Sequence, residues 1–181
     1  MFDSFQGDLK DPIHARDHQR GNPSAKVKIV LYLDFADPET VRLQKSLDQL
    51  MQSSADDVLI VYRHFPQTTR NVQAFAVAQA LEAAAKQDQF WEMLDQILAH
   101  QDQLTDGFLR QYARAIDLDK AQFEDDFSHT DTLQRIRHDM QRASDSTIEQ
   151  APAIFINGLR QHGISLRFIH ELIASGGDVS G

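Results

Sequence analysis

The chain of 181 residues contains no cysteine. It therefore forms no disulfide and holds no dithiol for redox exchange. No run of about 18 apolar residues occurs in it, so no segment is expected to span a membrane. Residues 1–20 also lack the apolar core of a secretory signal. The absence of both cysteine and a signal favours the cytoplasm.

Basic patches are missing as well. The formal net charge is −9, the sequence pI is about 5.2, and lysine and arginine form no cluster. Binding to a phosphate backbone is not expected without such a cluster. The length suits a single domain that buries a proper core.

The most informative stretch is 27–41, VKIVLYLDFADPETV. Its first part is a continuous apolar run, typical of a buried strand. Asp37 is a good helix N-cap residue, and Pro38 fits the first helical position. The residues beyond continue with helical spacing: Leu43, Leu47, Leu50 and Met51. The stretch predicts a strand that runs directly into a helix, followed by a turn at 53–57.

The segment 34–40, DFADPET, resembles the active-site segment of the DsbA-like thioredoxin-fold family, in which Asp-Phe precedes Cys-Pro-x-Cys. The proline is kept as Pro38, whereas Asp37 and Thr40 occupy the two cysteine positions. Four further stretches resemble the family in the same order: 17–21 (DHQRG), 61–66 (VYRHFP), 89–93 (QFWEM) and 151–158 (APAIFING). The resemblance covers roughly residues 17–175.

The resemblance implies an α/β fold: a thioredoxin fold with a mixed central sheet, βαβ then ββα, and an all-helical insertion. We expect an N-terminal arm at 1–26 and a thioredoxin-fold domain made of 27–66 and 147–175. The helical insertion is expected at 67–146, and a flexible tail at 176–181. A second apolar run at 58–65 is typical of a parallel strand buried on both faces.

Helical spacing characterises the insertion. One expected apolar face includes Val72, Phe75, Ala76 and Ala83. Thr105 and Asp119 are expected helix caps, as is Ser165 before the last helix.

Three histidines could each have one of two roles. His14 and His18 are four residues apart, which would suit two metal ligands on one helical face. We favour two solvated histidines, because no third ligand is fixed by the sequence, and we expect no metal. His64 could act as a base, but we favour a hydrogen-bonded structural histidine.

The altered site restricts the chemistry. Asp37 places a carboxylate where the family has a reactive cysteine, and we interpret it as a cap, with Thr40 adding a local hydroxyl contact. An Asp37 nucleophile would need a base or metal that the sequence does not locate. The resemblance implies a cis peptide bond before Pro152. Ala151 could pair its backbone with a peptide, or Pro152 could merely shape the loop.

We therefore predict a protein without thiol–disulfide oxidoreductase activity and without a cofactor. The expected function is a peptide-binding or regulatory module. Its groove would involve Asp37, Pro38, Glu39, Thr40, Ala151 and Pro152. The expected partner is a protein or peptide. The alternative is a glutathione-dependent transferase or isomerase, although the charge of Asp37 would oppose a glutathione thiolate. The DHQRG segment ahead of the first strand also resembles domains attached to sodium/proton antiporters.

Overall fold

A computed structural model describes residues 9–177 of the chain, which divide into two compact units. The sheet unit comprises residues 9–33, 42–63 and 142–177, and the helical unit comprises 34–41 and 64–141. Residues 178–181 of the expected tail and residues 1–8 of the expected arm lie outside the described residues.

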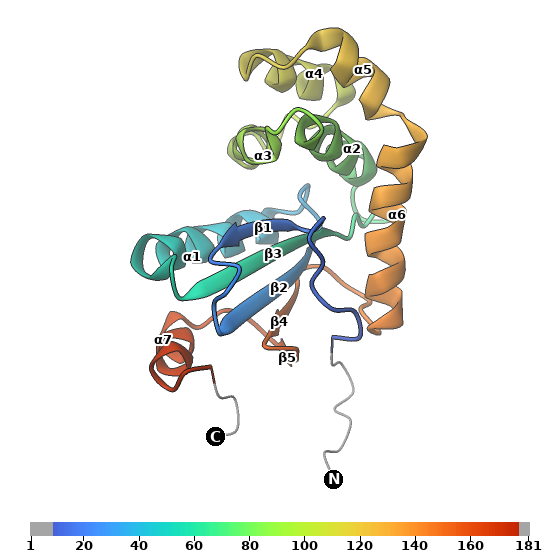
Figure 1. Ribbon diagram of the computed structural model, residues 1–181. Coiled ribbons are helices and arrows are strands. Elements are labelled where there is room, and N and C mark those ends of the chain that lie inside the picture. The colour runs from blue at the N-terminus through green and yellow to red at the C-terminus, as the bar shows by residue number, and fades with distance from the viewer. Residues whose placement is uncertain (1–8, 178–181) are drawn as a thin grey trace. The chain divides into compact units, whose positions relative to one another are not determined.

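The sheet unit is built on five strands in the order β1-β3-β2-β4-β5 (Figure 1). Three neighbouring pairs are antiparallel: β1 with β3, β2 with β4, and β4 with β5. β2 and β3 are joined by the long helix α1, the crossover that a parallel pair requires. The strands are β1 (His18–Gly21), β2 (Val27–Leu33), β3 (Val58–His64), β4 (Ala153–Ile156) and β5 (Leu159–Gln161).

The core of this unit lies around β2 and β3, as their apolar runs predict. Every residue of β3 is buried, and in β2 only Lys28 is exposed. Helix α1 (Pro38–Ser54) follows β2, and α7 (Leu166–Ala174) packs against β2. Ser165 caps α7 as expected, since its hydroxyl accepts the Phe168 N–H at 3.3 Å. The turn after α1 is shorter than the predicted 53–57, because the helix continues to Ser54.

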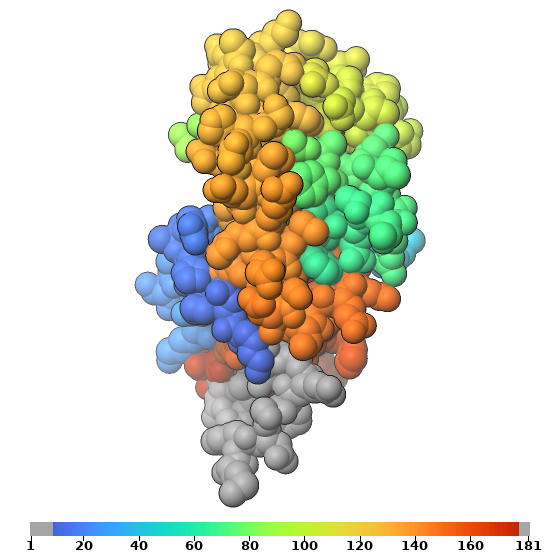
Figure 2. Space-filling view, turned by 90° about the vertical axis from the view of Figure 1, so that its right-hand side faces the viewer, coloured from blue at the N-terminus to red at the C-terminus, as the bar shows by residue number. Residues whose placement is uncertain are grey.

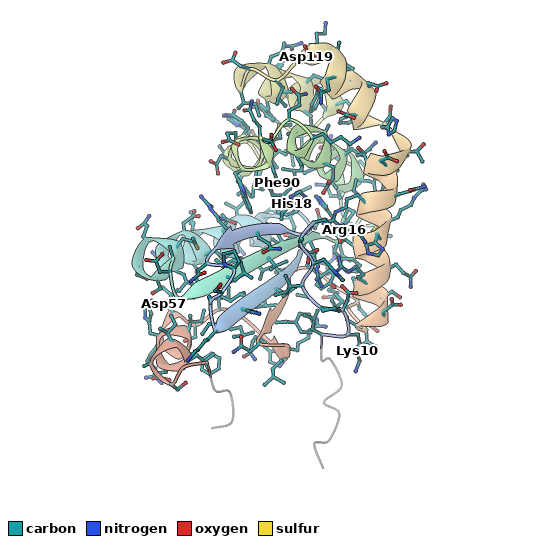
Figure 3. All side chains as sticks on the ribbon, viewed as in Figure 1. Lys10, Arg16, His18, Asp57, Phe90 and Asp119 are labelled. Carbon is teal, nitrogen blue, oxygen red and sulfur yellow. The ribbon has the colours of Figure 1, made fainter. Side chains whose placement is uncertain are left out.

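The helical unit is formed by α2 (Ala74–Ala85), α3 (Phe90–Ala99), α4 (Asp106–Ala115), α5 (Lys120–Phe127) and most of α6 (Thr130–Asp145). Alanines on α2 allow α3, α4 and α5 to pack against it. Phe90 stands at the start of α3, and Asp119 at the start of α5 (Figure 3). The Asp119 carboxylate accepts the Gln122 N–H at 2.8 Å, which confirms the expected cap.

The prediction that Val72 belongs to a buried helical face is wrong. Helix α2 begins only at Ala74, and Val72 is 87% exposed. The physical reason is local. The Asn71 side-chain oxygen accepts the Gln73 N–H at 2.9 Å, a turn that competes with the helix.

Candidate functional site

Helix α1 begins where the sequence predicts, at Pro38, and Asp37 is its cap. One carboxylate oxygen of Asp37 accepts the Glu39 N–H at 2.9 Å. The Asp37 carbonyl accepts the Thr40 N–H, also at 2.9 Å. The negative charge of Asp37 therefore lies at the positive end of the helix dipole.

Thr40 makes the local hydroxyl contact that the sequence suggests. Its side chain is buried, and its hydroxyl donates to the Asp34 carbonyl at 2.6 Å. Asp37, Pro38, Glu39 and Thr40 thus form one continuous helix start in the helical unit. This start has a carboxylate and a buried hydroxyl where the DsbA-like pattern has two thiols.

The structure adds Asp34, which sequence reasoning passed over. Asp34 is 1% exposed, and each of its carboxylate oxygens accepts one backbone N–H at 2.9 Å. The donors are Ala36, next to the helix start, and Gln67, in the loop after β3. Burial raises the pKa of Asp34, and the Asp37 charge adds to this, although the two N–H donors and Arg70 oppose it. An aspartate directly after an apolar strand was the available signal.

A loop at 67–73 completes this side of the helical unit. The Asn71 amide donates to the Ala36 carbonyl at 3.2 Å. One guanidinium nitrogen of Arg70 lies 3.9 Å from an Asp37 carboxylate oxygen. The helix start is therefore bordered by one cationic side chain.

The other predicted site residues lie in the sheet unit. The Ala151–Pro152 peptide bond is cis and directly precedes β4. Ala151 is buried and Pro152 is half-buried. Within residues 9–177, neither the N–H nor the C=O of Ala151 has a hydrogen-bond partner.

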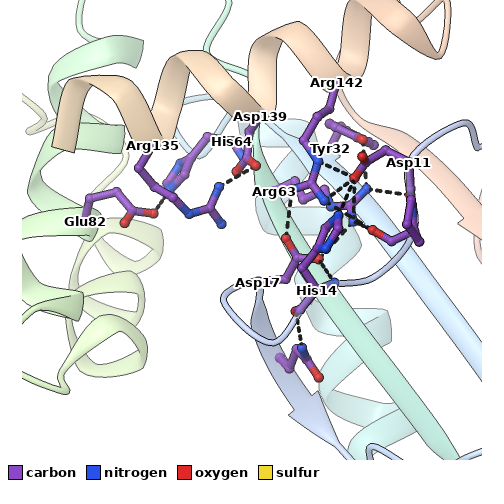
Figure 4. Close-up of polar contacts among 12 residues, drawn as sticks. Asp11, His14, Asp17, Tyr32, Arg63, His64, Glu82, Arg135, Asp139 and Arg142 are labelled. Carbon is purple, nitrogen blue, oxygen red and sulfur yellow. Dashed lines mark hydrogen bonds and ion pairs between the residues drawn. The ribbon is translucent and has the colours of Figure 1, made fainter. Parts of the chain in front are cut away.

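The DHQRG segment contributes a buried ionic cluster to the sheet unit (Figure 4). Asp17 accepts from Arg63 at 2.9 Å and from Arg142 at 3.0 Å. Arg142 also contacts Asp11. Burial alone would raise the pKa of Asp17, but hydrogen bonds from Arg63 and the His14 N–H, with the two arginine charges, lower it overall. The cluster joins the segment after residue 9 to the C-terminal end of α6. Figure 2 shows this segment, in blue, beside the orange helix.

His64 has hydrogen-bond partners for both its ring and its backbone. His64 is buried, and its Nε2 lies 2.7 Å from a Glu82 carboxylate oxygen, within the helical unit (Figure 4). Its backbone N–H donates to Asp139 at 2.9 Å. This agrees with a hydrogen-bonded structural histidine. His18 lies in β1 and His14 precedes that strand, so the two do not share a helical face.

A mixed five-stranded sheet, entered by a strand–helix–strand unit and carrying inserted helices, defines a thioredoxin-like fold. A family model described as Thioredoxin matches residues 14–173, and the chain belongs to this family.

Solved structures agree on the fold. A thioredoxin-like oxidoreductase from Silicibacter pomeroyi has a TM-score of 0.77 at 18% identity, covering 96% of both chains. Wolbachia pipientis alpha-DsbA1 has a TM-score of 0.77 at 17% identity, covering 93% of this chain and 94% of that one. At such identities the likeness concerns the fold alone, and this fold is the DsbA-like form.

Curated relatives share more sequence. The chain is 37% identical over 150 residues to Na(+)/H(+) antiporter NhaA 1 of Mycolicibacterium gilvum, covering 82% of this chain. It is 38% identical over 157 residues to Na(+)/H(+) antiporter NhaA 3 of Salinispora tropica, covering 86% of this chain. It spans only 24% of the length of either relative. Among residues 9–177, no helix is both long and apolar enough to cross a bilayer.

Proposed function

We propose that this chain is a redox-inactive member of its family that binds an extended segment of a peptide or protein. The observation that carries the proposal is the capping of α1 by Asp37, in the place of a reactive cysteine. A thiolate there would be stabilised by the helix end and would attack disulfides. The carboxylate satisfies the same helix end but has no accessible redox couple. Catalysis is lost, while the helix start is retained.

The second part of the proposed site is the Ala151–Pro152 segment. An extended peptide binds a backbone segment through main-chain hydrogen bonds, which requires an N–H and a C=O not already used in the fold. The backbone groups of Ala151 meet this requirement within the described residues. We infer that a peptide pairs with the backbone of Ala151 in the sheet unit. We propose the residues from Asp37 to Thr40, in the helical unit, as a second peptide-contacting segment.

The antiporter relatives support a regulatory reading of this binding. The relatives are named as antiporters, but this chain spans only 24% of the length of the first of them, so we do not propose transport for it. We propose that the chain is a regulatory module whose partner is a protein, and that it acts in the cytoplasm, where a cysteine-free chain needs no oxidising surroundings.

The test is selection from a random heptapeptide phage library on the immobilised chain, followed by NMR titration with the synthesised best peptide. We expect amide shifts at residues 36–41 and 149–153. The same peptide, N-methylated at alternate backbone positions, should lose binding in one alternation and keep it in the other. Absence of any enriched peptide would contradict the proposal. Reduced glutathione is titrated in parallel, and saturable shifts with glutathione alone would favour a transferase or isomerase instead.

A further inference from the structure

The loop at 67–73, here named the recognition loop, is fixed at both ends to the segment that leads into α1. At its start, the Gln67 N–H donates to the Asp34 carboxylate at 2.9 Å. Near its end, the Asn71 amide donates to the Ala36 carbonyl at 3.2 Å. Inside the loop, the Gln67 carbonyl accepts the N–H groups of Arg70 and Asn71, at 2.8 and 3.0 Å. The loop is thus held in one conformation beside the helix start.

This fixed loop presents two exposed side chains, Arg70 and Val72, and of these only Arg70 has a charged neighbour within 4 Å. Val72 is 87% exposed and is the single large apolar side chain so exposed among residues 9–177. The Arg70 side chain is 50% exposed, and its nearest charged partner, Asp37, is 3.9 Å away. Within the described residues, the guanidinium of Arg70 donates no hydrogen bond. A guanidinium has five N–H donors and matches a carboxylate in bidentate geometry.

We propose, building on the peptide binding proposed above, that the recognition loop selects peptides with an acidic side chain close to an aliphatic one. Arg70 receives the carboxylate, and Val72 packs against the aliphatic group. Ordering a loop on binding costs free energy, and this loop is already ordered by Asp34 and Asn71. The two exposed groups therefore act without that cost.

Negative charge could oppose an acidic peptide in two ways, through Asp37 beside Arg70 and through the net charge of the chain, and neither cancels the preference. Asp37 lies close to Arg70, but its carboxylate is engaged by the Glu39 N–H and the helix end. The net charge of −9 acts at long range, and exposed charges are screened beyond about 8 Å at physiological ionic strength. Contact with the exposed guanidinium then decides the local preference.

Asp34 is the positioning residue of this surface. Its carboxylate accepts one N–H from the helix-start segment and one from the recognition loop. An Asp34→Asn side chain retains only one oxygen acceptor, so one of the two segments is released. The amide resonance of Gln67 or of Ala36 should then lose its hydrogen-bonded shift, which a role confined to stability would not produce in the folded protein.

The test compares the heptapeptide selection on the unchanged chain with selections on Arg70→Glu and Val72→Ser. We expect the unchanged chain to enrich Asp or Glu beside Leu, Ile or Val. Arg70→Glu should enrich Lys or Arg in place of the acid, and Val72→Ser should lose the aliphatic preference. Arg137→Glu is the matched control, because Arg137 is exposed on α6 in the same unit and should leave the selection unchanged.

A charge swap then measures the contact. The best acidic peptide should bind Arg70→Glu about tenfold or more weakly, and its acid-to-lysine analogue should recover binding to that variant. The inference fails if Arg70→Glu keeps the acidic preference, or if the unchanged chain enriches basic peptides. Peptide binding that depends on backbone N-methylation but ignores both loop variants would overturn this inference alone. Absence of enrichment on every chain would overturn the proposed function with it.

Discussion

At the scale of single residues, Asp37 connects sequence, fold and chemistry most directly. It accepts the Glu39 N–H and lies at the positive end of α1. Asp37→Ala should lower the free energy of unfolding by about 0.5–2 kcal/mol. Asp37→Asn should cost less, because it keeps the cap and loses only the dipole contribution of about 0.3–1 kcal/mol. Urea unfolding of the three proteins measures this, and a stabilised Asp37→Ala would point to a strained, functional carboxylate.

Asp17 should make stability depend on pH in the acid range. Its pKa is lowered below the ordinary 3.8 in the folded chain, so the folded state binds this proton less readily than the unfolded state. The contribution is therefore present above the unfolded value and is lost as the pH falls through the folded one. Asp17→Asn should cost about 3–5 kcal/mol at pH 7, because the buried guanidinium groups of Arg63 and Arg142 lose one of the two carboxylates that they share.

The difference in unfolding free energy between the unchanged chain and Asp17→Asn should become smaller as the pH falls from 5 to 3. This range brackets the ordinary carboxyl pKa of about 3.9. Asp57→Asn is the control for a surface substitution, since Asp57 is exposed in the same unit and lies outside the buried ionic cluster. A difference that stays constant with pH would refute the assignment.

Asp34 should contribute with the opposite sign. Its folded pKa is raised above the ordinary 3.8, so between the two values the folded state binds the proton more tightly than the unfolded state. Stability from this group falls as the pH rises through that window. Titration of the Asp34 carboxyl carbon by NMR should give a midpoint above 3.8. A midpoint at or below that value would contradict the role of burial.

At the scale of elements, local sequence patterns predict strands and helix starts correctly where no side-chain hydrogen bond competes with the expected structure. The apolar runs predicted β2 and β3, and the capping residues Asp37, Asp119 and Ser165 predicted three helix starts. The start of α2 was missed because an Asn71 side-chain hydrogen bond competes with the helix. Asp34 was missed because its importance comes from Gln67, which is 33 residues away in the chain. Contacts of that range leave no periodic signal.

Gly21, at the end of β1, is required by the packing of that strand on β3. Its φ is +96°, and a Cβ there would lie 2.3 Å from the Val58 carbonyl oxygen. Gly158 has a φ of +85° but open space around it, and Gly163 has open space without a positive φ. Gly158→Ala should therefore cost about 1–2 kcal/mol, from backbone strain alone.

Gly21→Ala should cost clearly more than that, because the clash adds to the strain, while Gly163→Ala should stay within about 0.5 kcal/mol of the unchanged chain. Thermal and urea unfolding of the three variants give the order. Equal effects of Gly21→Ala and Gly158→Ala would mean that the close approach to β3 is absent.

At the scale of the whole molecule, the chain keeps the family fold and a helix that starts at Pro38, but it contains no cysteine. The family model that matches residues 14–173 shows the family membership. The composition shows that cysteine is absent. The fold could be predicted because several motifs recur in the family's order. The partner could not, because binding depends on exposed groups such as Arg70 and Val72, whose exposure no sequence pattern indicates.

The most direct test restores the sulfur. Asp37→Cys should give a thiol whose pKa is clearly below the free value of about 8.5, because it lies at a helix start. The double variant Asp37→Cys, Thr40→Cys should oxidise to an intramolecular disulfide. The Cα atoms of residues three apart on a helix lie about 5–6 Å from each other, which is within disulfide range. The unchanged chain should show no turnover in an insulin-reduction assay from which contaminating thioredoxin is excluded. A residue-37 thiol that titrates like a free cysteine, with no disulfide in the double variant, would contradict the account.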